Sequence, residues 1–158
     1  MEFGTFMEFH TRTGNLQKEA FDESFNHAMQ AEELGLNTIW LSESHFSPDR
    51  SVLSAPLIIA SSIASRTKNV KIGTAVQVIP LSNPIRIAEE VATLDHISGG
   101  RFEFGVGRSG LPEPMTDTVF HMVKAETDFM SHWKLLSLRL QTIPSHTKAN
   151  STALMMSA

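Results

Sequence analysis

Two residues suited to moving protons stand close together in the first third of the chain. Glu43 and His45 follow the short apolar run at residues 38–41, and only Ser44 separates them. The near-neutral pKa of histidine suits general acid–base chemistry, and Glu43 lies beside it. The alternative is a loop histidine bonded to a backbone carbonyl. Glu43 and His45 are therefore candidate catalytic residues, provided that the surrounding elements bring them into a site.

A second candidate lies further along, where glycines flank an apolar residue. Gly105 and Gly107 stand on either side of Val106, and glycines in a strand allow close backbone approach to a ligand. Arg108 follows and could pair with a phosphate or an acidic substrate group; a solvated arginine is the equal alternative. The segment lacks the third glycine and the downstream acidic residue of a dinucleotide-binding fingerprint.

Composition excludes several other chemistries. The chain has 158 residues, no cysteine, and seven histidines without a His-x-x-x-His pair, so we expect neither disulfides nor a metal site. A net charge of −4 gives no footprint for nucleic acid or an anionic membrane. The longest apolar stretch, residues 55–64, is far shorter than the roughly 20 residues that span a bilayer, and no signal peptide is visible. We expect a soluble cytoplasmic protein.

Strands and helices are expected to alternate through the first 110 residues. Short apolar or β-branched runs predict strands at residues 3–9, 38–41, 70–79 and 101–106. Residues 18–34 read as an amphipathic helix ended by Gly35. Residues 57–65 and the segment after residue 83 read as further helices, each opened by a capping residue before proline: Ser54 with Pro56, and Asn83 with Pro84.

This alternation predicts right-handed βαβ units and a parallel sheet. Parallel sheets carry functional residues in the loops at the carboxyl ends of their strands. We therefore expect the site after Phe9, after Leu41, around residues 74–79 and after Val106. Glu89, Glu90 and Asp95 fall on a helix, where a solvated or intersubunit face is the better interpretation than a catalytic carboxylate pair.

The strand ends resemble those of a known family. Residues 38–46 (Thr-Ile-Trp-Leu-Ser-Glu-Ser-His-Phe) resemble the W-L-x-E-H-H-F strand end of luciferase-like monooxygenases. Residues 73–84 resemble that family's third strand and following loop. Residues 88–102 are similar to its A-E-x-x-A-x-L-D-x-x-S-G-G-R signature, and residues 104–108 complete a collinear match over residues 1–112.

The resemblance implies the first four βα units of a (β/α)8 TIM barrel that binds reduced FMN, or the deazaflavin coenzyme F420, and oxidises a small organic substrate with O₂. It places His45, which stands beside Glu43, near flavin and substrate, and it places Thr74 and Ala75 against the flavin ring. Together with Gly107 and Arg108, these two residues are the candidates for cofactor binding. One departure matters. Ser44 replaces the first histidine of the family's pair, and serine cannot act as a base near pH 7, so the resemblance does not extend to aldehyde oxidation of the bacterial luciferase type.

Residues 113–158 do not continue the pattern. They show no clean helical stripe, and the family resemblance ends with residue 112, so we expect a domain at 1–112 and an irregular or partly helical tail. If the codons of the tail are read one base earlier, those of His132, Trp133 and Lys134 can only encode Leu followed by Glu. These two residues would lie inside a plausible amphipathic helix. The other codons complete this helix with particular synonymous choices. The hypothesis is that one nucleotide was lost near Pro112 and that the tail is frameshifted.

A half barrel has open sheet edges and an uncovered inner face. Because barrels commonly hold phosphate after strands seven and eight, we expect weak or no flavin binding and little or no turnover by this chain alone. Two alternatives stay open: a non-enzymatic fragment that self-associates or pairs with a full-length relative, and a complete small α/β protein with another ligand.

Overall fold

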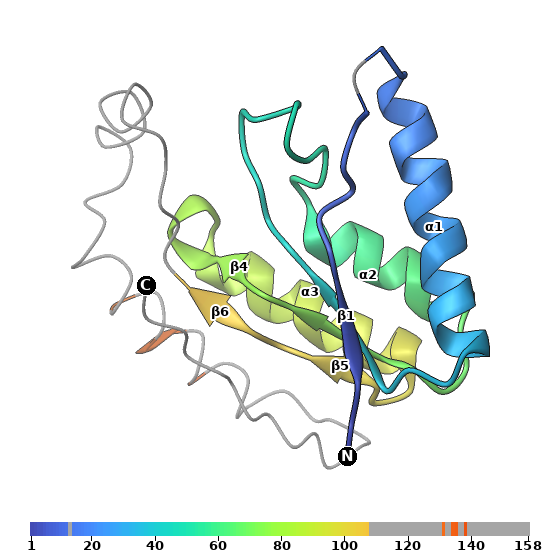
Figure 1. The fold of residues 1–158 in the computed structure, drawn as a ribbon. Coiled ribbons are helices and arrows are strands. Elements are labelled where there is room, and N and C mark those ends of the chain that lie inside the picture. Colours follow the sequence, from blue (N-terminus) through green and yellow to red (C-terminus); the bar gives the residue numbers. More distant parts are fainter. Residues whose placement is uncertain (13, 108–130, 132–133, 136–137, 139–158) are drawn as a thin grey trace.

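The computed structural model describes residues 1–12, 14–107, 131, 134, 135 and 138. Strands and helices alternate as the sequence predicts (Figure 1). Their bounds are β1 Gly4–Met7, α1 Gln17–Glu33, β2 Thr38–Leu41, α2 Pro56–Ala64, β3 Lys71–Thr74, β4 Gln77–Val78, the 3₁₀ helix η1 Ile79–Leu81, α3 Pro84–Ser98, β5 Phe102–Glu103 and β6 Val106–Gly107.

The strands form a parallel sheet in the order β1-β2-β3-β5, continued by the parallel pair β4-β6. The register aligns Met7, Leu41 and Thr74 at the carboxyl ends of the first three strands. The three helices lie along one side of this sheet (Figure 1). Parallel strands joined by crossover helices and meeting at one edge are the architecture of a partial (β/α) barrel, which confirms the predicted fold class.

Two predicted strands are each interrupted. The strand expected over residues 70–79 is divided into β3 and β4, and the Ala75–Val76 peptide between them is cis. The strand expected over 101–106 is divided into β5 and β6. The two interruptions meet, because the Gln77 N–H donates to the Gly105 carbonyl at 2.8 Å. The interruptions come from contacts between segments distant in sequence, which a hydrophobic run cannot reveal.

The helix ends follow local chemistry, with one exception. The Asn83 side chain accepts from the N–H groups of Ile85 and Arg86, as a cap before Pro84 should. Gly35 follows α1 with a φ of 77°, the left-handed conformation that glycine adopts without strain. The prediction of a serine cap for α2 is wrong: Ala55 is the cap residue and no side chain bonds there, so Pro56 at the first helical position opens the helix unaided.

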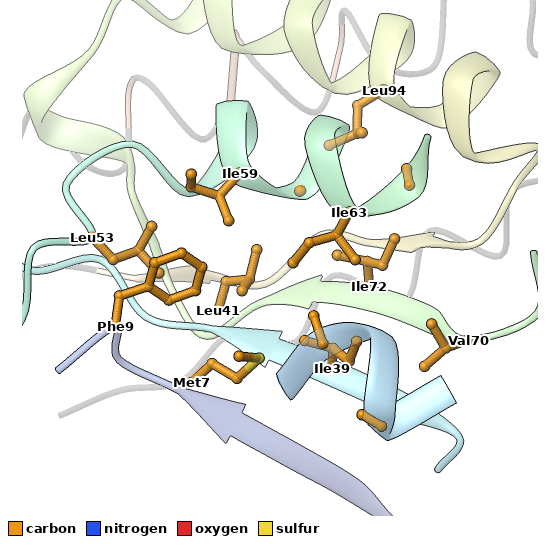
Figure 2. Packing of buried hydrophobic residues seen from close by; sticks show 14 residues of the cluster. Met7, Phe9, Ile39, Leu41, Leu53, Ile59, Ile63, Val70, Ile72 and Leu94 are labelled. Carbon is orange, nitrogen blue, oxygen red and sulfur yellow. The ribbon is translucent and has the colours of Figure 1, made fainter. Parts of the chain in front are cut away.

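The main core lies between the sheet and its helices (Figure 2). Ile39, Leu41 and Ile72 of the sheet are fully buried against Ile63 of α2. Each such side chain contributes about 1.5–3 kcal/mol by leaving water. The predicted apolar stripe of α1 faces this core, with Ala28 fully buried and three larger side chains partly buried: Phe21, Phe25 and Met29.

The opposite face of the sheet carries different residues. Phe6, Trp40 and Gly73 follow one another across β1, β2 and β3 in register. The Trp40 ring lies over Gly73 so closely that a Cβ there would come within 2.3 Å of it. Phe6 is 56% exposed. This face is therefore aromatic and open to solvent at β1, as expected for the inner face of an incomplete barrel.

The side chains of Arg101 and Glu32 make hydrogen bonds at the amino-terminal end of the sheet. Arg101 donates to the Thr67 hydroxyl and to four carbonyls, those of Ala64, Thr67, Val70 and Ser98. Glu32 accepts the N–H groups of residues 68–70, which lead into β3. These bonds connect α1, α2 and β3 at the end of the sheet away from the candidate site. No helix in the described part of the chain is long and apolar enough to cross a membrane.

Candidate functional site

The candidate site lies where the strands end. The loop after β2 carries Glu43 and His45, and the segment after β3 carries Ala75 and Val76. The Ala75 N–H donates to the Leu41 carbonyl at 2.7 Å, so the two segments leave the sheet side by side. The parallel sheet thus brings together two of the four expected positions, although Leu41 and Ala75 are 34 positions apart in sequence.

Glu43 and His45 form a direct pair. The Nε2 atom of His45 lies 2.7 Å from Oε1 of Glu43, and the two side chains are 19% and 3% exposed. The other carboxyl oxygen, Oε2, accepts the N–H of Val78 at 2.8 Å. Glu43 therefore ties the loop after β2 to β4 and orients the imidazole at the same time.

The surroundings of Glu43 change its proton affinity. Burial raises the pKa of Glu43 above its ordinary value, against the opposing effects of the Val78 N–H and of His45. When the carboxylate is ionised, it holds the Nε2 proton of a neutral imidazole, and the Nδ1 atom is then a hydrogen-bond acceptor. The pair can take up or release a proton at a partly exposed position, which is what general acid–base chemistry requires.

The loop that carries His45 is held in place. The Ser44 N–H donates to the Leu53 carbonyl at 2.9 Å, which fixes the residue between the two partners of the pair. Phe46, directly after His45, has a φ of 57°. A bulky residue in the left-handed region costs on the order of 1–3 kcal/mol, and such residues gather at functional sites. The Phe46 ring is 67% exposed beside the imidazole.

Thr74 and Ala75 differ in what they offer a ligand. Thr74 is fully buried, and its hydroxyl donates to the Gly105 carbonyl at 2.8 Å and accepts the Gly105 N–H at 3.1 Å. That hydroxyl is engaged in joining two strands. Ala75 is half-buried at the strand end and presents a small apolar surface. Contact of either residue with a cofactor stays a prediction.

The two glycines after β5 allow close contacts within the chain. A Cβ on Gly105 would lie 2.0 Å from the Thr74 carbonyl oxygen, and a Cβ on Gly107 would lie 2.7 Å from Cγ2 of Val76. The close approach that was expected toward a ligand is therefore made toward the segment around β3. A cofactor contact by Gly107 stays a prediction, and Arg108 lies outside the described residues.

Three polar groups near the site were not anticipated. The Val78 N–H is a partner of Glu43, and the side-chain oxygens of Ser42 and Gln77 are buried with no hydrogen-bond partner in the described part of the chain. Both side chains are only 5% exposed. The signal was present in the sequence, because Ser42 and Gln77 are polar residues inside or beside apolar strand runs.

The candidate carboxylates of α3 lie apart from this site. Glu89 and Glu90 are exposed on α3, and Arg86 lies 3.6 Å from Glu89, which fits the expected solvated face. Within the residues that the structure describes, no group of three or more His, Asp or Glu side chains could hold a metal ion. The site is therefore one acid–base pair beside a small apolar strand end.

A parallel βα sheet with its helices along one side and polar residues at its carboxyl edge is the arrangement found in (β/α) barrel proteins. A family model described as luciferase-like monooxygenase matches residues 1–121. The chain belongs to this family of luciferase-like monooxygenases, which confirms the resemblance read from the strand ends.

Relatives and solved structures agree. The chain is 36% identical over 108 residues to the alkanal monooxygenase alpha chain of the Kryptophanaron alfredi symbiont, covering 68% of this chain and 30% of that protein. It is 34% identical over 105 residues to the alkanal monooxygenase beta chain of Vibrio harveyi, covering 66% and 32%. The oxygenating constituent of 3,6-diketocamphane monooxygenase from Pseudomonas putida has the same fold, with a TM-score of 0.79, 21% identity and coverage of 96% and 42%. The chain thus spans about a third of the length of these curated relatives.

Proposed function

We propose that the strand-end site belongs to a flavin-dependent oxidoreductase that uses reduced flavin and O₂ to oxidise a small organic substrate. The observation that carries the proposal is the Glu43–His45 pair, with Nε2 and Oε1 2.7 Å apart, beside the end of β3. Membership of the luciferase-like monooxygenase family supports it. The pair supplies proton transfer but no redox group, so the oxidation needs a cofactor.

The residues present fit a flavin ring. Ala75 and Val76 are half-buried and apolar, and Gly107 brings no side chain into the space beside Val76. A flat, largely apolar ring needs such a surface, together with a few polar groups at its edge. The buried Ser42 hydroxyl, which has no partner in the described residues, is a polar group of this kind beside Glu43. When bound, the flavin would supply the electron transfer to O₂.

His45 and Glu43 have separate roles in this proposal. His45, 19% exposed, moves the proton of the substrate or of water through its Nδ1 atom. Glu43, 3% exposed, does not contact the substrate: it holds Nε2 and fixes the ring orientation. Ser44 occupies the position next to His45 and is not a base, so a single histidine carries the proton chemistry.

FMN is the proposed cofactor, and coenzyme F420 is the alternative. The 3,6-diketocamphane monooxygenase constituent is a complex with FMN. A tetrahydromethanopterin reductase from Methanopyrus kandleri, with a TM-score of 0.62 and 18% identity, is F420-dependent. The relatives at 34–36% identity are monooxygenases, which favours FMN.

This chain by itself is expected to bind flavin weakly and to turn over little or no substrate. The phosphate site of such barrels commonly follows strands seven and eight, which have no counterpart in β1 to β6. β1 to β6 offer no phosphate site of that kind, so we expect the ring to provide the affinity. FMN and riboflavin should then bind equally, with a dissociation constant of about 1 mM, which corresponds to roughly −4 kcal/mol.

Amide chemical shifts test this proposal. The full chain, labelled with nitrogen-15, is titrated with FMN and separately with riboflavin. We expect both ligands to move the resonances of residues 43–45 and 75–78 with the same midpoint, and the variant Ala75→Trp to abolish the effect. The variant His27→Gln, on the exposed face of α1, should leave the titration unchanged. Shifts confined to other residues, or none, would contradict the flavin site.

A second copy of the chain is a further proposed partner, supported by the outer face of the helices. A groove of about 350 Å³ runs between α2 and α3, and beside it Ile58 and Ile97 are 71% and 48% exposed. Exposed aliphatic side chains beside a groove favour self-association. Light scattering on the full chain tests it: a dimer that Ile58→Glu converts to monomer supports the proposal, and a wild-type monomer at high concentration contradicts it.

A further inference from the structure

The loop between β2 and α2 closes on itself at the acid–base pair. The Ser44 N–H donates to the Leu53 carbonyl at 2.9 Å, so the two ends of the segment 44–53 are joined. Two further N–H groups of this segment donate to the Ser47 carbonyl, each at 2.9 Å. A compact loop whose ends meet is an Ω-loop, a type that is frequently functional. Since His45 follows directly after Ser44, the geometry of this loop decides where the imidazole lies.

One buried hydroxyl joins this loop to β1. Ser51 is 3% exposed, and its Oγ accepts the Leu53 N–H at 3.1 Å. The same hydroxyl donates to the carbonyl of Glu8, which directly follows β1. The Leu53 carbonyl in turn accepts the Ser44 N–H. A continuous series of hydrogen bonds therefore runs from the end of β1 to Ser44, which stands between the two members of the acid–base pair.

The other contacts of the loop do not replace this hydroxyl. Arg50 lies 2.7 Å from Glu8, with side chains 70% and 32% exposed, and an ion pair as exposed as this contributes little to stability. The Leu53 side chain is fully buried and lies next to Phe9 in the core (Figure 2). Apolar packing is not directional, so it fixes where Leu53 lies but not how its peptide groups point. That direction is set by the hydrogen bond with Ser51.

We propose that Ser51 is a positioning residue for the Glu43–His45 pair. Its hydroxyl holds the Leu53 peptide, and the Leu53 carbonyl holds the Ser44 N–H. Ser44 then fixes the direction in which the His45 side chain leaves the loop. The distance of 2.7 Å between His45 Nε2 and Glu43 Oε1 therefore depends on Ser51. The inference rests on the proposed role of this pair in proton transfer.

Removal of the hydroxyl should open the loop. In Ser51→Ala, the Leu53 N–H and the Glu8 carbonyl both lose their partner, and a buried backbone group without a partner is costly. The loop relieves this cost by admitting water, which weakens the Ser44 hydrogen bond and exposes the Glu43 carboxyl. Because burial raises the pKa of Glu43, the entry of water should lower that pKa toward 4.5.

The test follows the carboxyl carbon of Glu43 by nuclear magnetic resonance in the full chain, without flavin or substrate. We expect the wild-type pKa to lie above 4.5 and that of Ser51→Ala to lie closer to it. Ser51→Thr keeps the hydroxyl and should restore the wild-type titration. Hydrogen exchange of the Ser44 N–H should be about tenfold faster in Ser51→Ala. Because no flavin is used, this result and the flavin titration can each fail without the other.

Two further variants serve as controls. Ser98→Ala removes another buried hydroxyl, 4% exposed and bonded to the Asp95 carbonyl at 3.0 Å, at the last residue of α3. Arg50→Gln removes the exposed ion pair within the same loop. Both variants should leave the Glu43 titration unchanged, since neither touches the hydrogen bonds that lead from β1 to Ser44.

The proposal is overturned if Ser51→Ala titrates like the wild type, if Arg50→Gln shifts the titration equally, or if Ser51→Thr titrates like Ser51→Ala. Should Ser51→Ala not fold, hydrogen exchange of the wild type decides. One opening of the loop breaks the bonds of both Ser44 and Leu53, so their N–H groups should be protected and exchange at similar rates. An unprotected N–H at either residue overturns the proposal.

Discussion

The single hydroxyl of Thr74 holds both backbone groups of Gly105. Oγ1 donates to the Gly105 carbonyl at 2.8 Å and accepts its N–H at 3.1 Å, in a place where neither residue is exposed. The contact sits where β3 and β5 both stop, between residues 31 positions apart. It keeps the carboxyl ends of these strands together, next to the segment that the proposed flavin ring would contact.

Replacement of Thr74 by valine should destabilise the chain. Thr74→Val keeps the side-chain shape but leaves the buried Gly105 N–H without its partner, which costs about 1–3 kcal/mol. Thr74→Ser retains the hydroxyl and serves as the control, with a smaller loss from the missing methyl group. Urea unfolding followed by circular dichroism measures both. A valine variant as stable as the serine variant would show that the hydrogen bonds contribute nothing.

Replacement of Glu43 should change how stability depends on pH. Burial raises the pKa of Glu43 above 4.5, so the folded chain holds this proton more tightly than the unfolded chain does. The resulting stabilisation is fully present below pH 4.5 and is lost as pH rises through the folded-state pKa. Glu43→Gln cannot ionise. We expect its free energy of unfolding to vary less with pH than that of the wild type over this acidic range.

The measurement is a series of thermal or urea unfolding curves from about pH 4 to about pH 8. Glu33→Gln, an exposed position on α1, is the surface control and should follow the wild-type profile. Glutamine still offers an oxygen to the Val78 N–H, so the local hydrogen bond is retained. Parallel profiles for the wild type and Glu43→Gln would contradict the conclusion that burial raises the pKa of Glu43.

Arg101 should be replaceable by lysine only at a cost. The guanidinium makes five hydrogen bonds, to Thr67 Oγ1 and to the carbonyls of Ala64, Thr67, Val70 and Ser98. A lysine ammonium carries three donors on one nitrogen and cannot make all five of these hydrogen bonds. We expect Arg101→Lys to lower the free energy of unfolding by about 2 kcal/mol. Arg86→Lys, exposed on α3, should change it by less than about 0.5 kcal/mol.

The frameshift hypothesis for residues 113–158 predicts a specific feature of the gene. Restoring one base near codon 112 should open a frame that continues through the remaining barrel units, roughly what a ~250-residue barrel requires. Sequencing the DNA across and beyond this point checks it. A gene that encodes the tail in frame, with no homologous continuation in another frame, would falsify the hypothesis.

The sequence by itself determined the order of the elements and most of their ends. Residues 38–41 form β2 as expected, Asn83 caps α3, and Gly35 follows α1 in the left-handed conformation. Each of these depends on neighbours within a few residues, so a local pattern is sufficient to predict it. The same holds for Glu43 and His45, since a polar pair after a buried strand marks a strand end.

Only the tertiary structure decided how the strand ends are joined. The strands expected over 70–79 and 101–106 are interrupted where Gly105 meets Thr74 and Gln77, and Glu43 reaches across 35 positions to the Val78 N–H. Gly105 and Gly107, which were expected to approach a ligand, approach Thr74 and Val76 instead. Hydrogen bonds of this range depend on two backbones being placed side by side by the packed core, and periodicity along one segment carries no record of its partner.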